Sequence, residues 1–203
     1  MFEKSSPDFT DAYNQLLTFH NDIIGPPMSK KEEEMLLDRA IPMTFEKKKV
    51  IVNIDQVCDM VYFINEGIIR EYYLAEGKEQ IMRFYTKNSY VYSFVSYVKQ
   101  IPSKLIIDTL TECKVLAFKR KSIMELYEKS PIFIDFARRL NRESFIFSSE
   151  KVESFILQDA KTRYLEMLKN HPEIILLVPN YMIASYLGIT PESLSRIKKS
   201  LCK

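Results

Sequence analysis

Residue types on which many enzyme sites depend are scarce in this sequence. Its 203 residues include four glycines, three cysteines and two histidines, and no tryptophan. The few glycines are spread along the chain, so neither a P-loop nor a G-x-G-x-x-G phosphate-binding turn can form, and no G-x-S-x-G nucleophile motif occurs. We therefore expect no catalytic residues and a protein that is not an enzyme. Acidic pairs are common on protein surfaces, so the sequence does not exclude a catalytic pair of carboxylates, and an enzyme is the minor alternative. A cluster of polar side chains that converge in the folded chain would favour that alternative.

The cysteines and histidines do not form a recognisable metal or disulfide pattern. Cys58, Cys113 and Cys202 are far apart and odd in number, which suits neither a disulfide framework nor a zinc or iron–sulfur spacing. His20 and His171 are too few for a barrel whose strands supply several histidine ligands to a metal. The sequence predicts no metal site and no cofactor, and cysteines that are reduced.

Long apolar runs are also absent. No stretch approaches the roughly 20 uncharged apolar residues of a membrane helix, and residues 1–8 lack the apolar core of a signal peptide. Hydrophobic residues nevertheless make up 46% of the chain, enough to exclude disorder and to bury a core. We expect a soluble, cytoplasmic protein with no membrane partner.

The pattern along the chain changes from helix to strand and back to helix. Helical periodicity covers residues 8–24, and Ser29 with Glu32 forms a capping box that opens a second, short helix. Short strands rich in Val, Ile, Tyr and Phe follow at residues 49–53, 61–65, 68–74, 79–85, 104–109 and 113–118. Helices return at 121–129, 131–157 and 159–170. Many short strands separated by turns predict an antiparallel barrel or jelly roll in an α+β protein.

The expected helix 131–157 is too long to bury on one small barrel, because it would extend over 35 Å at about 1.5 Å per residue. One reading is a kinked helix packed on its own domain. We favour the other, a seam between two copies of the chain with Leu140, Phe147 and Phe155 near its two-fold axis.

Residues 180–201 have the pattern of a helix-turn-helix. Gly188 can end a first helix in the left-handed conformation, Thr190 can cap a second, and Pro191 suits its first position. From residue 180 to the end the net charge is +3, since four basic residues face one acid, Glu192. An ordinary helical hairpin would explain the apolar positions but not this cap combined with Arg196 and a basic tail. DNA binding is therefore favoured.

Two stretches carry a resemblance to a known family. YFINEGIIREYYLAEGKEQIMRFY (62–85) is similar to the barrel signature of Crp/Fnr-type transcription regulators, and IASYLGITPESLSRIKKSL (183–201) is similar to their DNA-binding helices. The resemblance covers roughly residues 25–203. It implies an N-terminal cyclic-nucleotide-binding-like sensor domain (1–130), a long dimerisation helix (131–158) and a C-terminal helix-turn-helix domain (159–203). It also implies a homodimer that binds an inverted repeat in double-stranded DNA, with RNA polymerase as a further partner.

The resemblance assigns a DNA-reading role to the second helix of the motif. In the family a Glu-x-x-Ser-Arg run reads the operator, and Glu192, Ser195 and Arg196 match it. Arg196 can contact guanine and Glu192 can accept from cytosine. The candidate DNA-binding residues are Thr190, Glu192, Ser193, Ser195, Arg196 and Lys199. Pro191 stands where some members carry a further arginine. A degenerate regulator that binds protein and not DNA is the alternative.

The residues that hold cyclic AMP in the family are missing. Members that bind it have a glycine-rich loop with a Glu, and an Arg that follows a Pro, whereas residues 87–94 contain no glycine and Ser103 follows Pro102. The nearest equivalents are Tyr92, Ser93, Ser103 and Lys104. Cyclic AMP binding is not expected, and the sequence specifies neither another effector, nor the operator, nor whether transcription is raised or lowered. An aromatic barrel that is simply filled is favoured over one that holds an apolar ligand.

Overall fold

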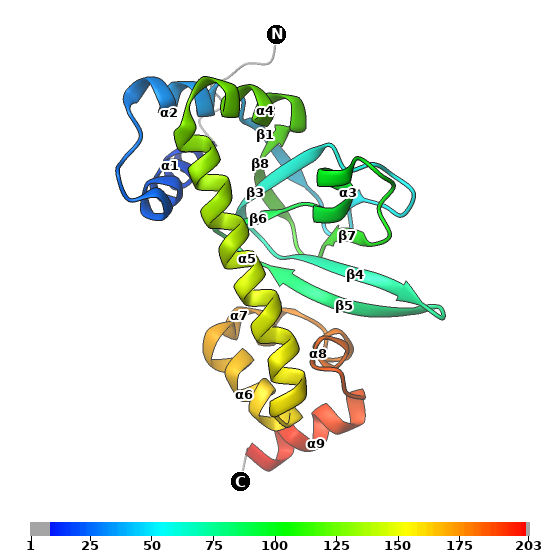
Figure 1. Ribbon diagram of the computed structural model, residues 1–203. Coiled ribbons are helices and arrows are strands. Elements are labelled where there is room, and N and C mark those ends of the chain that lie inside the picture. The colour runs from blue at the N-terminus through cyan, green and yellow to red at the C-terminus, as the bar shows by residue number, and fades with distance from the viewer. Residues whose placement is uncertain (1–8, 202–203) are drawn as a thin grey trace.

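The computed structural model describes residues 9–201 and shows a β-domain followed by helices (Figure 1). Helices α1 (Thr10–Ile24) and α2 (Lys30–Leu37) come first, and α2 begins with the predicted capping box between Ser29 and Glu32. The strands are β1 (Ile41–Phe45), β2 (Val50–Val52), β3 (Met60–Glu66), β4 (Ile69–Ala75), β5 (Lys78–Tyr85), β6 (Ser89–Val91), β7 (Ile106–Thr109) and β8 (Cys113–Lys119). One short helix, α3 (Phe94–Lys99), lies between β6 and β7.

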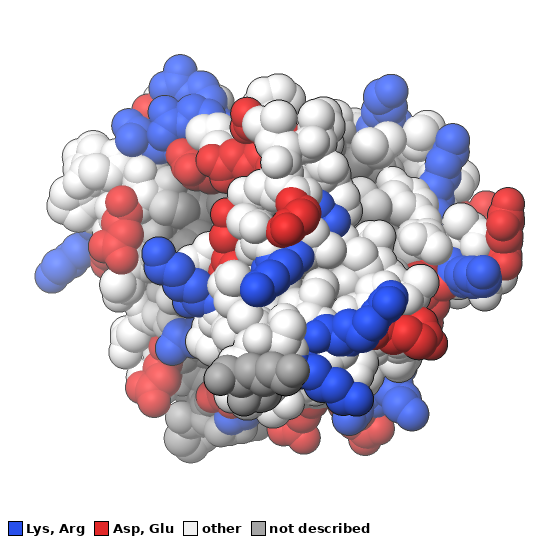
Figure 2. Space-filling view, turned by 90° about the horizontal axis from the view of Figure 1, so that it is seen from below, with Lys and Arg blue, Asp and Glu red and all other residues white. Residues whose placement is uncertain are grey.

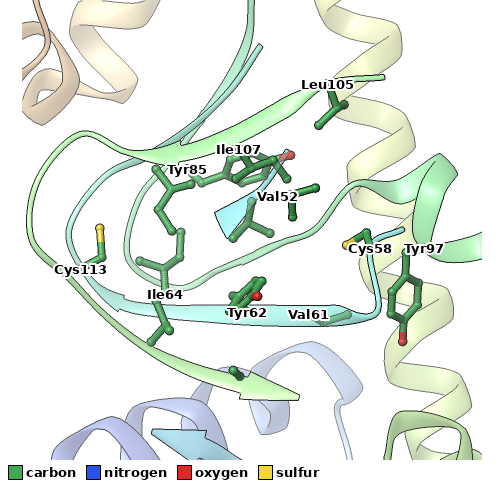
Figure 3. Close-up of a cluster of buried hydrophobic side chains, with 14 residues drawn as sticks. Val52, Cys58, Val61, Tyr62, Ile64, Tyr85, Tyr97, Leu105, Ile107 and Cys113 are labelled. Carbon is green, nitrogen blue, oxygen red and sulfur yellow. The ribbon is translucent and has the colours of Figure 1, made fainter. Parts of the chain in front are cut away.

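The strands form two four-stranded antiparallel sheets, in the orders β1-β8-β3-β6 and β2-β7-β4-β5. Their inner faces pack on each other in the barrel interior, where side chains from both sheets meet (Figure 3). Strand β3 is buried on both sides, as its unbroken apolar run requires: Ile64 faces the interior, and Phe63 packs against the helices outside. The predicted α+β class with an N-terminal antiparallel jelly roll is confirmed.

A single long helix leads away from the barrel. Helix α4 (Arg120–Lys129) ends at Ser130, and α5 (Pro131–Leu157) begins at once with proline in its first turn. Helix α5 crosses the barrel and continues to the far end of the molecule, where α6 (Ala160–Asn170), α7 (Pro172–Leu177), α8 (Asn180–Leu187) and α9 (Pro191–Leu201) gather around it (Figure 1).

Three further findings bear on the sequence predictions. Cys58 and Cys113 are free and buried, and Cys202 lies outside the described residues. No helix among those described combines the length and apolar character that crossing a membrane requires. Within residues 9–201 no His, Cys, Asp and Glu side chains are grouped so as to hold a metal ion.

Candidate nucleic-acid interface

Helix α8 is the buried half of the helix-turn-helix. Ile183 and Ala184 are fully buried, and the small Ala184 lets neighbouring helices approach closely. The helix ends at Gly188, whose φ of 70° lies in the left-handed region, and the N–H of Ile189 donates to the carbonyl of Ala184 at 3.0 Å. A Cβ at Gly188 would lie 2.8 Å from the ring of Phe155. The left-handed conformation of the turn therefore favours glycine, and any larger residue would also have to displace the Phe155 ring.

Helix α9 is capped and anchored as the sequence predicts. The N–H of Ser193 donates to the hydroxyl of Thr190 at 3.2 Å, so Thr190 caps the helix, and Pro191 occupies its first position. Leu194 is only 1% exposed and Ile197 is half-buried, both against the cluster that holds α8. The opposite face of α9 is left to solvent.

The exposed face of α9 carries most of the predicted DNA-binding residues. Glu192, Ser195, Arg196 and Lys199 are all exposed and follow one another at helical spacing. Ser193 is half-buried, and its hydroxyl accepts from Nη2 of Arg196 at 3.1 Å, which steadies the arginine near the start of the helix. The structure thus brings five of the six predicted residues together on and just before the first two turns of α9, and places Lys199 one turn further on.

The exposed face of α9 carries both negatively and positively charged side chains. Hydrogen bonds from its own backbone N–H and from Thr190 at the start of α9, with the charge of Arg196 nearby, lower the pKa of Glu192 below its ordinary value. Glu192 is therefore an ionised acceptor. Lys198 is turned aside to the side-chain oxygen of Asn180 at 2.5 Å. Viewed from this end, the molecule shows lysine and arginine side chains interspersed with acidic ones and not one continuous basic surface (Figure 2).

The helix-turn-helix is docked on the β-domain through contacts that sequence reasoning missed. The hydroxyl of Ser185 donates to the carbonyl of Glu79 at 2.8 Å and accepts from the N–H of Ile81 at 3.1 Å. Within the helical part itself, Arg163 of α6 donates to the carbonyls of Leu187 on α8 at 2.9 Å and of Gln158, just after α5, at 2.6 Å. A serine in a helix and an arginine near a helix start carry no sequence signal for such contacts, because each partner is a backbone group.

A buried ion cluster lies beneath α8. Arg70 on β4 forms two hydrogen bonds with Asp108 on β7, at 2.7 and 2.9 Å, and two more with Glu79 on β5. Arg70 is 6% exposed and Asp108 is 7% exposed. Nη1 of Arg70 also lies 3.5 Å from the sulfur of Met182, so the cluster faces α8 directly.

Two of the four residues predicted to line a ligand site, Ser93 and Ser103, bond each other, and the other two do not join them. Ser93 and Ser103 are both 2% exposed, and their hydroxyls lie 3.0 Å apart. Ser103 also bonds both backbone groups of Leu105. The hydroxyl of Tyr92 donates to Asn141 of α5 at 3.1 Å, and Lys104 is exposed.

The residues predicted for a dimer seam differ in exposure. Leu140 and Phe147 are half-buried against their own chain, and Arg83 lies 3.9 Å from the centre of the Phe147 ring. Phe155 is 43% exposed. The most exposed large apolar side chains on α5 are Phe145, Val152, Ile156 and Leu157, at 73, 61, 75 and 73%.

Comparison with known proteins agrees with the fold. Residues 42–130 match the family model of the cyclic nucleotide-binding domain. No curated protein matches the chain significantly. The comparison with solved structures, in contrast, finds several that share nearly the whole fold.

Three of these structures are bacterial regulators. The c-di-GMP-responsive global regulator CLP of Xanthomonas campestris superposes with a TM-score of 0.66 at 14% identity, over 85% of this chain and 91% of that one. FixK2 of Bradyrhizobium japonicum superposes with a TM-score of 0.65 at 21% identity, and the match covers 80% of this chain and 84% of FixK2. A transcriptional regulator of the Crp/Fnr family from Eubacterium rectale superposes with a TM-score of 0.66 at 15% identity, and the match covers 85% of this chain and 83% of that one. The predicted resemblance to Crp/Fnr-type regulators is confirmed in the fold.

Proposed function

We propose that this chain, which has the fold of the Crp/Fnr-type regulators and a cyclic nucleotide-binding domain at residues 42–130, is a transcription regulator that binds double-stranded DNA in a sequence-specific manner as a homodimer. The observation that carries the proposal is the exposed face of α9. A capped helix presents a guanidinium, a carboxylate and a hydroxyl in its first two turns, with a lysine one turn later. Side chains of these types at a recognition helix can read base edges in the major groove.

The homodimer is supported by large apolar side chains that α5 exposes to solvent. Phe145, Ser148, Val152 and Phe155 follow the three- and four-residue steps of a coiled-coil seam. Phe145 and Val152 are more than half exposed, and a second copy of the same helix would cover them. A two-fold dimer would present two α9 helices to successive major grooves about 34 Å apart, and the operator would be an inverted repeat.

Regulation by cyclic AMP is not part of the proposal. The segment that would hold the phosphate offers two buried serines already bonded to each other, and no arginine. The barrel interior is occupied by apolar and aromatic side chains from both sheets (Figure 3). A nucleotide phosphate would have to be buried there without a paired cation, which is strongly unfavourable.

The test is a selection of bound duplexes from a random DNA pool by the full chain. We expect an enriched inverted repeat whose half-sites are about one helical turn apart. Failure to enrich any sequence, with binding that is equally weak on all duplexes, would favour the alternative of a protein-interaction module. RNA polymerase, a partner implied by the same function, can then be tested on the selected operator.

The same preparation tests the independence from cyclic AMP. A ligand present at about 100 times its dissociation constant stabilises its protein by about 2.7 kcal/mol. We expect cyclic AMP to cause no thermal shift and no calorimetric heat, and to leave operator affinity unchanged. A saturable shift would mean that backbone amides and Lys104 suffice for binding.

A further inference from the structure

A cavity lies on the side of the barrel that the helices cover, and neither Ser93 nor Ser103 lines it. Its volume is about 330 Å³, it is partly open to solvent, and residues of α3, α4 and α5 line it, with His20 of α1 on its wall. The walls are mainly aromatic and aliphatic, and include Tyr90, Phe133, Phe136 and Leu140. This size is at the lower end of the range of about 300–1,000 Å³ for small-molecule sites, which are also mostly apolar.

His20 and Tyr90 leave one hydrogen-bond donor unused at this wall. Nε2 of His20 lies 2.7 Å from the Tyr90 hydroxyl, and the imidazole stacks on the ring of Phe136 at 3.6 Å. His20 is 3% exposed, and burial lowers its pKa to about 3, so the ring is neutral. A neutral imidazole and a phenol together carry one N–H and one O–H, and the bond between them uses only one proton. Nδ1 of His20 has no partner within the described residues.

Tyr97 and Arg120 add two further groups to the same cavity. Tyr97 is 8% exposed, its hydroxyl has no partner among residues 9–201, and Figure 3 shows that hydroxyl pointing away from the barrel interior. Nε of Arg120 donates to the Tyr97 carbonyl at 3.3 Å, and the guanidinium lies 5.8 Å from the centre of the Tyr97 ring. No carboxylate in the described part of the chain forms an ion pair with Arg120.

An apolar cavity whose polar groups are spare donors and an unpaired guanidinium suits one class of ligand. We propose that this cavity binds a small apolar carboxylic acid, with its hydrocarbon or aromatic body among Phe133, Phe136 and Leu140. The carboxylate accepts from Arg120 and from the Tyr97 hydroxyl, since charge-assisted bonds to a guanidinium are the strongest available there. Buried donors that lack a partner destabilise the empty site, and the ligand removes that penalty.

The long helix α5 forms one wall of the cavity. Its walls join α3 and α4 to the first three turns of α5, so a bound acid would contact the barrel and the helix that leads to the DNA-binding domain. A role as effector rests on the proposed function, whereas binding of the acid does not. The experiment therefore measures binding to the full chain in the absence of DNA.

The probes are naphthoate, its neutral analogue naphthylmethanol, and octanoate. The chain has no tryptophan, so naphthoate fluorescence can be excited beyond the tyrosine absorption without background. We expect saturable binding of naphthoate and octanoate, and binding of naphthylmethanol that is weaker by about tenfold or more, because it cannot form the charge-assisted bond.

Two variants and a matched control locate the site. Arg120→Gln and Tyr97→Phe should each weaken naphthoate binding, the former by about tenfold or more. Tyr97→Phe removes a hydroxyl that has no partner, so it should unfold at the same or a higher temperature than the wild type. Tyr181→Phe removes an exposed hydroxyl on α8 and should change nothing. Absence of saturable binding by both acids, or equal affinity in the wild type, Arg120→Gln and Tyr97→Phe, would overturn the proposal.

Discussion

The hydroxyl of Ser185 accepts a hydrogen bond from the backbone N–H of Ile81, at 3.1 Å, although 104 residues separate them in the chain. Ile81 lies on β5, the edge strand of its sheet. The backbone N–H and carbonyl groups that point away from β4 have no neighbouring strand with which to form hydrogen bonds. Ser185 also donates to the carbonyl of Glu79 at 2.8 Å. One serine of the helix-turn-helix thus occupies two positions where a further strand would bond, and it ties α8 to the β-domain.

Replacing Ser185 with alanine should loosen this docking. The loss of two hydrogen bonds at one part-buried site is expected to cost about 1–3 kcal/mol. Hydrogen exchange of the Ile81 amide should accelerate accordingly, while amides in β3 keep their protection. Ser200→Ala is the matched control, because its hydroxyl bonds only within its own helix. Unchanged exchange at Ile81 would show that apolar contacts alone hold the two parts together.

Asp108→Ala should be among the most destabilising changes in the β-domain. It would leave Arg70, which is 6% exposed, with Glu79 as its remaining carboxylate partner. Removing one member of a buried ion pair typically costs about 3–5 kcal/mol. Urea unfolding followed by circular dichroism measures the difference.

A surface pair provides the control for this prediction. Arg138 and Asp135 lie 2.7 Å apart, but both are more than half exposed. Solvent screens such a pair, so Asp135→Ala should cost between about 0 and 1 kcal/mol. Equal losses for the two aspartates would mean that burial does not strengthen the Arg70 cluster.

Stability should fall below neutral pH because of His20. Burial lowers its pKa from 6.5 to about 3. The folded chain then binds fewer protons than the unfolded chain between these two values. The contribution of neutral His20 is complete above the unfolded pKa and is lost as the pH falls toward the folded one. Between a pH of about 6.5 and about 5 this amounts to about 2 kcal/mol.

The variant His20→Gln isolates that contribution. Glutamine keeps a polar atom near Tyr90 but does not titrate in this range, so the fall in unfolding free energy from pH 7 to about 5 should be smaller than in the wild type by about 2 kcal/mol. Ser200→Ala, which removes no titratable group, provides the comparison and should retain the wild-type slope. If both variants behaved like the wild type, carboxylates and not His20 would govern the acid response.

The sequence predicts elements well where a local rule is sufficient. The capping box at Ser29 and the left-handed Gly188 are found as expected, because caps and turns depend on neighbours in the chain. Strands β1 and β6 and helices α3 and α7 were missing from the prediction. Each of these is six residues or shorter, which is too short for the apolar residues to show a helical or strand repeat.

The arrangement between parts of the chain was much harder to predict. Phe147 belongs to the apolar stripe of α5, yet it packs under Arg83 of its own chain, while Phe145 is left more exposed. Helical spacing shows which residues share a face, but not which of two faces meets the barrel. Ser185 and Arg163 bond to backbone carbonyls, which every residue possesses, so nothing in their spacing marks the partner.

Phe145→Glu should prevent formation of the proposed homodimer. The side chain is 73% exposed, so the variant monomer should fold normally, but the dimer would place two carboxylates together in an apolar seam at a cost of several kcal/mol. Sedimentation equilibrium measures the change in association. Glu153→Ala, a change on the same helix that removes a charge, is the comparison. A Phe145→Glu chain that remained dimeric would move the interface away from this side of α5.

Arg196 and Lys199 should contribute to DNA binding in different ways. Arg196 is exposed in the second turn of α9 and steadied by Ser193 at 3.1 Å, so it is placed to form two bonds with a guanine. Lys199 is exposed one turn further on, where contact with a phosphate is the more frequent role of a lysine.

Arg196→Ala should cost about 1–3 kcal/mol per half-site and relax the preference at one base position. Lys199→Ala should weaken binding to all sequences about equally and reduce the salt slope by about one unit per contact. Titrations of the selected operator and its single-base variants at two salt concentrations separate these outcomes. If Arg196→Ala weakened every variant operator by the same factor, Arg196 would be a phosphate contact, and the reading of bases would rest with Glu192 and Ser195.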